Sequence, residues 1–163
     1  MAHNCAVKLD DLTPADWQAC ALIYEEGLDE GTFEEAVPSW ESWDATHLAA
    51  PRLVARDGGA VLGWAALAPI SRRECYRGVA ENSIYVARAK RGRGVGRALL
   101  AELVRRAEAA GIWTIQAGIL AGNDASVRLH ESCGFRLIGV RERLAQKRGV
   151  WRDALLMERR APD

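Results

Sequence analysis

The sequence lacks the features that mark several classes of protein. Its 22 basic and 22 acidic residues give a formal net charge of zero, so it has no excess of positive charge of the kind that nucleic-acid-binding proteins use. It has no apolar run long enough to span a membrane, no internal repeat and no low-complexity tract. The composition therefore predicts neither a nucleic-acid partner nor a membrane partner.

Cysteine is scarce and irregularly spaced. The four cysteines, Cys5, Cys20, Cys75 and Cys133, form no C-x-x-C pair and none of the spacings of zinc sites. The chain also shows no signal-peptide pattern. We therefore expect reduced thiols, a cytoplasmic protein and no metal site.

What is present suits one globular domain over residues 1–163. Hydrophobic residues make up 49% of the chain and charged residues 27%, which is enough for a sizeable core. Local patterns predict strands at 7–12, 53–56, 61–67, 80–86, 113–120, 135–140 and 153–158, and helices at 14–28, from 40, from 94 and at 124–133. Helices that alternate with hairpins predict an α/β fold of the mixed-sheet (α+β) kind, with about six or seven strands in a twisted central sheet and about four flanking helices.

Residues 83–100 form the most informative segment. Residues 84–86 are β-formers, and an amphipathic helix with apolar residues at every fourth position begins near Gly94. Between them, Gly92, Gly94 and Gly96 leave a turn with few side chains. Because the first N–H groups of a helix are unpaired and carry partial positive charge, such a turn binds phosphate.

Basic residues surround this turn, namely Arg88, Lys90, Arg91, Arg93 and Arg97. They supply more positive charge than one phosphate monoester needs, so we expect a ligand with several phosphates. The turn lacks the G-x-x-x-x-G-K-[ST] motif of nucleotide-binding loops, and its glycine spacing differs from the G-x-G-x-x-G of dinucleotide-binding folds.

The segment Arg91-x-x-Gly94-x-Gly96 resembles the signature of the GCN5-related N-acetyltransferase (GNAT) superfamily. The resemblance implies the fold of that superfamily, acetyl-CoA as cosubstrate and a turn that holds its pyrophosphate. An asparagine at the position of Asn123 contacts the pantetheine arm in that superfamily, although Asn123 also suits a helix N-cap. The cosubstrate-binding residues implied are Ile84, Tyr85, Val86, Arg91, Gly92, Arg93, Gly94, Val95, Gly96, Arg97, Asn123 and Ser126.

Acetyl transfer to an amine needs a base, a donor to the developing oxyanion and a proton for the leaving thiolate. Glu81, at the start of the strand that enters the turn, is either the base or a solvated strand-end charge. The backbone N–H of Val86 is a candidate oxyanion donor. His130 stands where many superfamily members have a tyrosine directed at the CoA sulfur, and it suits proton donation, a relay with Glu81 or a structural role.

A closer resemblance covers about residues 7–158. Segments 76–86, 123–126, 129–131 and 147–153 resemble the phosphinothricin N-acetyltransferase family, which acetylates the α-amine of phosphinothricin, methionine sulfoximine and, in one branch, arsinothricin. The resemblance implies Glu81 as base and His130 as its assistant. It also implies a homodimer. The implied substrate-binding residues are Phe33, Arg73 and Tyr76, and the candidate interface residues are Trp40, Trp43 and Trp151.

The departures from that family concern the amine acceptor. Val150 replaces an arginine of the tail, Ser71 replaces a lysine of the substrate loop, and residues 31–33 replace a Thr-x-Ser-Phe segment. Two alternatives therefore stay open: an acetyltransferase acting on another amine, such as a peptide N-terminus or a polyamine, and a non-catalytic acetyl-CoA-binding protein. A polyamine favours an acidic pocket, which the Arg72–Arg73 loop does not supply.

Overall fold

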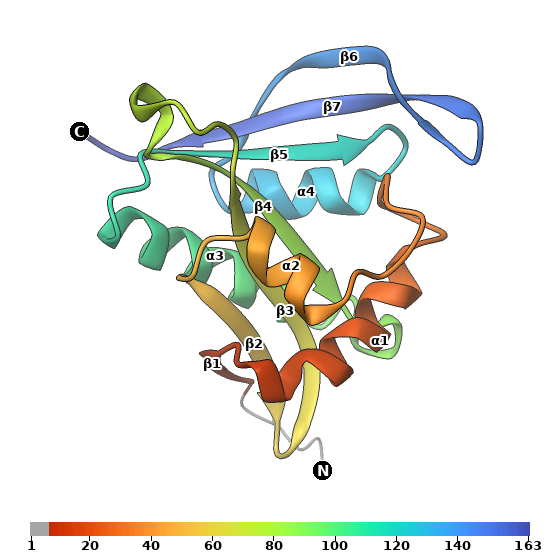
Figure 1. Cartoon of the computed structure of the whole chain (residues 1–163), viewed down its shortest axis with the longest axis vertical. Helices are drawn as coiled ribbons and strands as arrows, with labels where there is room; N and C mark the ends of the chain where they lie inside the picture. Colours follow the sequence, from red (N-terminus) through yellow and green to blue (C-terminus); the bar gives the residue numbers. More distant parts are fainter. Residues whose placement is uncertain (1–6) are drawn as a thin grey trace.

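The computed structural model describes residues 7–163, whose strands form one mixed seven-stranded sheet with helices on both faces (Figure 1). The strands are β1 (Lys8–Asp11), β2 (Arg52–Asp57), β3 (Ala60–Pro69), β4 (Val79–Val86), β5 (Thr114–Leu120), β6 (Arg136–Lys147) and β7 (Val150–Arg160). The α-helices are α1 (Trp17–Gly27), α2 (Trp40–Thr46), α3 (Val95–Ala109) and α4 (Asp124–Ser132). Short 3₁₀ turns lie at η1 (Pro14–Asp16), η2 (Glu74–Tyr76) and η3 (Arg88–Lys90).

The order of elements and the mixed sheet confirm the predicted fold class. Two predicted caps are also confirmed: the Ser39 hydroxyl accepts from the backbone N–H of Ser42 at the start of α2, and the Asn123 side chain accepts from that of Ser126 at the start of α4, both at 3.2 Å. Such caps satisfy N–H groups that a helix leaves unpaired.

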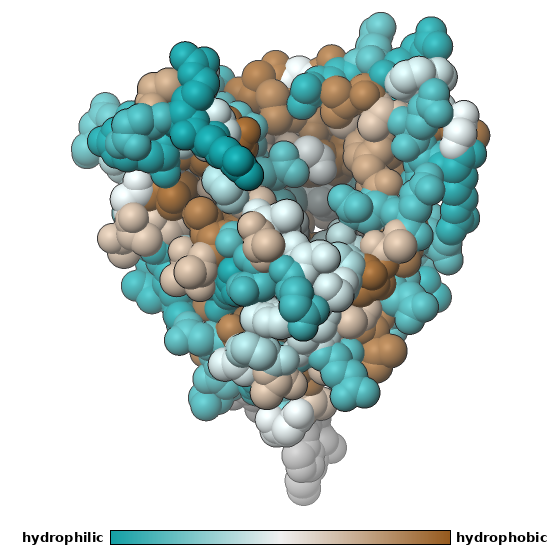
Figure 2. Space-filling model, in the orientation of Figure 1, coloured by the Kyte–Doolittle hydropathy of each residue, from teal (hydrophilic) through white to brown (hydrophobic). Residues whose placement is uncertain are grey.

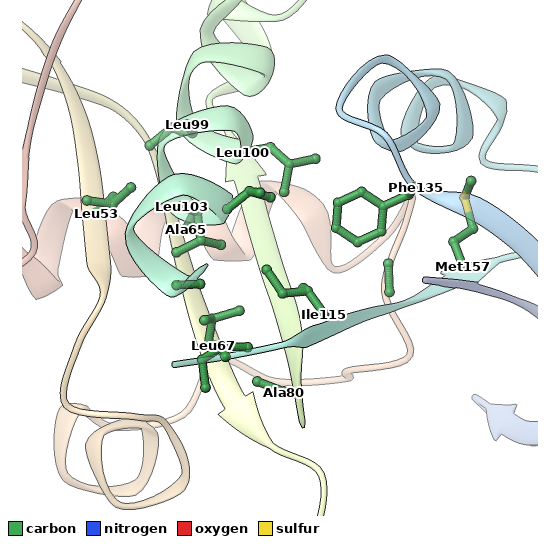
Figure 3. Packing of buried hydrophobic residues seen from close by; sticks show 14 of the residues in the cluster. Leu53, Ala65, Leu67, Ala80, Leu99, Leu100, Leu103, Ile115, Phe135 and Met157 are labelled. Atoms are coloured by element: carbon green, nitrogen blue, oxygen red, sulfur yellow. The ribbon is translucent and has the colours of Figure 1, made fainter. Parts of the chain in front are cut away.

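The two faces of the sheet bury different sets of residues. On β2 and β3, Leu53 and Leu67 face one way, while Val54 and Trp64 face the other, because successive residues of a strand alternate. The first set packs against α3, whose buried residues are Val95, Leu99, Leu100, Leu103, Val104 and Ala107 (Figure 3). Both faces of these strands are covered, so their sequences read as continuous apolar runs.

The opposite face is dominated by aromatic rings beneath α1 and α2. Trp64 and Tyr85 stack with centroids 4.8 Å apart, and Tyr24 stacks on Tyr85 at 4.6 Å. Trp43 meets Trp64 edge to face at 5.6 Å and is only 1% exposed. The prediction of Trp43 as a dimer-interface residue is therefore wrong, because its side chain belongs to this core.

The C-terminal hairpin is longer than predicted. The sequence patterns gave strands at 135–140 and 153–158, whereas β6 and β7 together run almost continuously from Arg136 to Arg160. The pairing shifts register between Arg141 and Ala145, and Arg143 has a positive φ of 47°. A bulge of this kind breaks the alternation of polar and apolar residues that identifies a strand from sequence.

Within residues 7–163, no helix combines the length and the apolar character that a membrane span requires. Cys20, Cys75 and Cys133 are free thiols, whereas Cys5 lies outside the described residues.

The sheet opens at one place, between β4 and β5. The sheet order is β1-β2-β3-β4-β5-β7-β6, and β4 and β5 are its one parallel pair. Their pairing covers Val79–Glu81 against Thr114–Gln116 and then stops, so the remaining residues of the two strands diverge. We call this divergence the splay.

Candidate active site

A cleft of about 580 Å³ opens at the splay and continues to the glycine-rich turn. Figure 2 shows the molecule hollowed on the face seen in Figure 1, between the upper strands and helices α1 and α2. The cleft brings together predicted site residues from five segments of the chain. Those that line it are Phe33, Glu81, Ile84, Tyr85, Val86, Arg91, Gly92, Gly94, Gly96, Arg97, Asn123, Ser126 and His130.

The phosphate turn, residues 91–97, occupies one end of this cleft. Gly94 is the N-cap of α3 and has a φ of 82°, a left-handed conformation that favours glycine. A Cβ at Gly92 or Gly94 would have no protein atom within 4 Å, so these positions leave open space in front of the helix N-terminus. The Val95 side chain is buried in the core, and Val95 does not line the cleft.

Two of the arginines in and just before the turn, Arg91 and Arg88, pair with an acid that the sequence analysis did not identify. Glu30 accepts from Arg91 at 2.6 Å and lies 3.1 Å from Arg88. The hydrogen bond from Arg91 lowers the pKa of Glu30, with both arginine charges adding to the effect. A phosphate ligand at the turn would compete with Glu30 for Arg91. Arg93 is exposed and does not line the cleft.

Backbone groups of β4 point into the splay. Ala87, directly after β4, donates its N–H to the Leu62 carbonyl of β3, and the Val79 carbonyl accepts from the N–H of Ile70. The odd-numbered residues of β4 therefore turn their backbone polar groups toward β3. Ile84 and Val86 consequently turn theirs toward β5, beyond the last paired residues. Consistent with this, the Val86 carbonyl accepts from Arg91 Nε at 3.2 Å. The N–H of Val86 is thus placed to donate into the cleft.

Glu81 lies at the apex of the splay, because it is the last residue of β4 that pairs with β5. A Cβ added to Gly118 of β5 would lie 4.0 Å from Glu81 Oε2, so glycine leaves space in front of the carboxylate. Surrounding protein raises the pKa of Glu81, an effect that Arg141 opposes. The carboxylate nevertheless opens onto the cleft, so solvent moderates this shift. A raised pKa is what a carboxylate needs to act as a general base near neutral pH.

His130 is buried on the other side of the cleft, on α4, with 2% of its surface exposed. Its Nδ1 lies 2.7 Å from the carbonyl oxygen of Ser126, and its Nε2 lies 3.2 Å from Asn82 Oδ1. Phe135 packs edge-on against the ring at 5.0 Å. Burial lowers the pKa of His130, which favours the neutral ring, while the hydrogen bond to Ser126 opposes this.

Residues 14–135 match the model of the acetyltransferase (GNAT) family. The chain belongs to this family. It is 41% identical over 109 residues to an L-methionine sulfoximine/L-methionine sulfone acetyltransferase of Pseudomonas paraeruginosa. That match covers 66% of this chain and 63% of the relative, so it spans less than two thirds of the relative's own length.

Two solved structures cover most of this GNAT chain. A ribosomal-protein-alanine N-acetyltransferase from Brucella melitensis has a TM-score of 0.85 and 35% identity, covering 94% of this chain and 99% of its own. A phosphinothricin acetyltransferase from Sinorhizobium meliloti, solved in complex with AcCoA, has a TM-score of 0.83 and 34% identity over 94% of this chain and 88% of its own. These findings confirm the predicted family and fold.

The acceptor side of this GNAT cleft depends on a loop between α1 and α2 that carries Phe33. Lys147, from the end of β6, is buried and donates to the carbonyl oxygens of Leu28 and Thr32, the latter at 2.6 Å. Gly31 approaches Asn123 of α4 closely, since a Cβ there would lie 2.7 Å from Asn123 Nδ2. The hairpin and α4 therefore hold the loop that forms one wall of the cleft.

Arg73 and Tyr76 lie outside this cleft. Both are exposed on the loop between β3 and β4, where the Arg73 guanidinium sits over the Tyr76 ring at 5.4 Å. Their assignment to substrate binding stays a prediction. The sequence analysis missed Glu30, Asn82 and Lys147, because their partners lie far away in the sequence. In the sequence, each of the three is only a polar residue near a recognised motif, which does not indicate a role.

Proposed function

We propose that this protein transfers the acetyl group of acetyl-CoA to the α-amine of a glutamate-like amino acid, such as phosphinothricin, methionine sulfoximine or arsinothricin. The observation that carries the proposal is the continuity of one cleft from the phosphate turn to Glu81. The glycine cradle, the free N-terminus of α3 and the arginines fit the pyrophosphate of acetyl-CoA. The acceptor class is supported by the names of the relative from Pseudomonas and of the structure from Sinorhizobium.

The residues at the splay suit direct transfer. Glu81 takes a proton from the ammonium group of the acceptor, which frees the nitrogen lone pair. The nitrogen forms a bond to the thioester carbon, and the Val86 N–H donates to the oxygen as negative charge develops on it. The carbon–sulfur bond then breaks, and the second proton that the nitrogen loses on becoming an amide ends on the departing thiolate, which leaves as the CoA thiol. His130 assists from the α4 side of the cleft.

A direct test is turnover of acetyl-CoA with a panel of acceptors, followed by release of free CoA thiol. The panel contains phosphinothricin, methionine sulfoximine, arsinothricin, glutamate, an aromatic amino acid, spermidine and a peptide that begins with alanine. We expect the highest kcat/KM among the first three. A higher value for spermidine or for the alanine peptide than for every anionic amino acid in the panel would refute the proposed acceptor.

A second candidate acceptor is a peptide N-terminus. It is favoured by the likeness to the ribosomal-protein-alanine N-acetyltransferase structure, which is 35% identical over 94% of this chain. The alanine peptide in the panel separates the two. A role in resistance to such amino acids would follow only if the enzyme prefers the glutamate-like acceptors.

We also propose that the protein is a cytoplasmic homodimer. Exposed apolar side chains gather on the β6–β7 hairpin: Leu137, Ile138, Val140, Leu144, Val150 and Trp151. An exposed apolar patch on a strand at the sheet edge suits self-association. The free thiols of Cys20, Cys75 and Cys133 agree with a reducing compartment. Light scattering of the wild type and of Trp151→Glu tests the dimer, which the charged variant should dissociate.

A further inference from the structure

Asn82 occupies a junction between three elements, and the sequence analysis gives it no role. It is the first residue of β4 after the pairing with β5 ends, and 8% of its surface is exposed. Its Nδ2 donates to the backbone carbonyl of Gln116 on β5 at 3.2 Å. The side chain therefore supplies one more bond between the two strands at the point where backbone pairing ends.

The other end of the same amide meets His130 of α4, at 3.2 Å from Nε2. Neighbouring residues of a strand point to opposite faces, so Glu81 and Asn82 leave β4 on opposite sides. Glu81 reaches toward Gly118, whereas Asn82 reaches toward α4. Two neighbouring residues of β4, Glu81 and Asn82, thus reach opposite walls of the cleft.

The hydrogen-bond donors at His130 follow from its partners. The Ser126 carbonyl only accepts, so Nδ1 carries a proton in the neutral ring. Nε2 is then the nitrogen that gains or loses a proton, and Asn82 is the residue that meets it. Because Nδ2 of Asn82 is engaged by the Gln116 carbonyl, the amide presents Oδ1 to Nε2, and this oxygen accepts from a protonated Nε2 but cannot donate to a neutral one.

We propose that Asn82 is a positioning residue of the acetyl-transfer site: it ties β4, β5 and α4 together at the apex of the splay and controls the proton on His130 Nε2. The inference rests on the proposed function only for its kinetic part. Within residues 7–163 the His130 ring lies against Asn82, Ser126 and Phe135, none of which titrates. Glu81 precedes Asn82 on β4, and Arg128 and Glu131 lie beside His130 in the sequence of α4.

The test compares Asn82→Leu and Asn82→Asp, which both keep the branching of the asparagine side chain at Cγ. Leucine removes both hydrogen bonds, and aspartate keeps an acceptor that favours a protonated ring. Nitrogen-15 NMR of the histidine rings, with His130→Ala to assign the signal, measures the pKa of His130 without any acceptor. We expect the pKa to rise in Asn82→Asp and to fall in Asn82→Leu. An unchanged pKa in both folded variants would overturn the proposal.

Kinetics provide the second measurement, with whichever acceptor the panel identifies. Asn82→Leu should lower kcat about tenfold, the factor that loss of one hydrogen bond represents, with an unchanged KM for acetyl-CoA. In a His130→Ala background the same substitution should have no further effect on kcat. A full additional loss there would show that Asn82 acts independently of His130. If the enzyme acetylated peptides only, the proposed acceptor would be refuted. The comparison of Asn82→Leu with and without His130→Ala could still be made with a peptide as acceptor.

Discussion

The two ends of the cleft are built in different ways. The phosphate turn comes from one stretch of chain, residues 91–97, and offers backbone N–H groups and exposed arginines. The acceptor end is assembled from side chains of β4, β5, α4, the loop after α1 and the C-terminal hairpin. Local sequence therefore specifies the first end, whereas only the folded sheet specifies the second.

This difference predicts separable effects of substitution. Changes in the phosphate turn should alter binding of acetyl-CoA for every acceptor alike. Changes at the acceptor end should alter kcat or the acceptor KM and leave the acetyl-CoA affinity unchanged. Each of the following substitutions can contradict that separation.

The largest effect is expected for Glu81→Gln. Loss of a general base typically lowers the rate ~10²–10⁴-fold, and the amide keeps the size of the side chain. The Kd for acetyl-CoA, measured by calorimetry, should match that of the wild type. Near-normal kcat in the variant would show that water or another group deprotonates the amine.

Gly94→Val should weaken acetyl-CoA binding by about tenfold or more, since a side chain would enter the space in front of the α3 N-terminus and would also be strained at a φ of 82°. Gly111→Val is the matched control. Its φ is 87°, it too has no protein atom within 4 Å of an added Cβ, and it follows the far end of α3. Equal loss of acetyl-CoA affinity in both variants would attribute the effect to backbone strain instead of to the ligand.

The same contrast explains what the sequence could reveal. The strand, glycine turn and helix around Gly94 were predictable because β-propensity, helix periodicity and capping are local properties. The splay was not, since it depends on where pairing between β4 and β5 stops. Asn82 and Lys147 were missed for that reason: each acts on a segment at least 30 residues away along the chain, Gln116 and Thr32 respectively. The full length of β6 was hidden by its bulge.

Arg73→Ala tests the weakest part of the acceptor assignment. If the loop between β3 and β4 closes over a bound acceptor, an arginine there would pair with an anionic end group. We then expect the KM for phosphinothricin to rise about tenfold, as for loss of one charged hydrogen bond, and the KM for a neutral amino acid to stay constant. An equal change for both acceptors would remove Arg73 from the recognition of charge.

Lys147→Met should have a smaller kinetic effect that is confined to the acceptor. Methionine keeps much of the side-chain volume but cannot donate to Leu28 and Thr32, so the wall that carries Phe33 loosens. The acceptor KM should rise by roughly threefold, less than the loss of one full hydrogen bond represents, because other contacts still hold the loop. Arg148→Met is the neighbouring control, since that side chain is exposed and pairs with Asp29 at the surface. A weakened acetyl-CoA Kd in Lys147→Met would contradict the separation of the two ends.

The smallest effect concerns stability, and it has the opposite sign to the loss of activity. Burial raises the pKa of Glu81 in the folded protein, so the ionised carboxylate destabilises the fold. Below the pKa of the unfolded chain both states are protonated and the penalty is absent. As the pH rises through the folded pKa the penalty becomes complete. Glu81→Gln should therefore melt above the wild type at pH 7 and no higher at pH 4, and solvent in the cleft keeps the gain small. A gain in Tm that is equal at both pH values would mean that packing, and not the charge of the Glu81 carboxylate, is responsible.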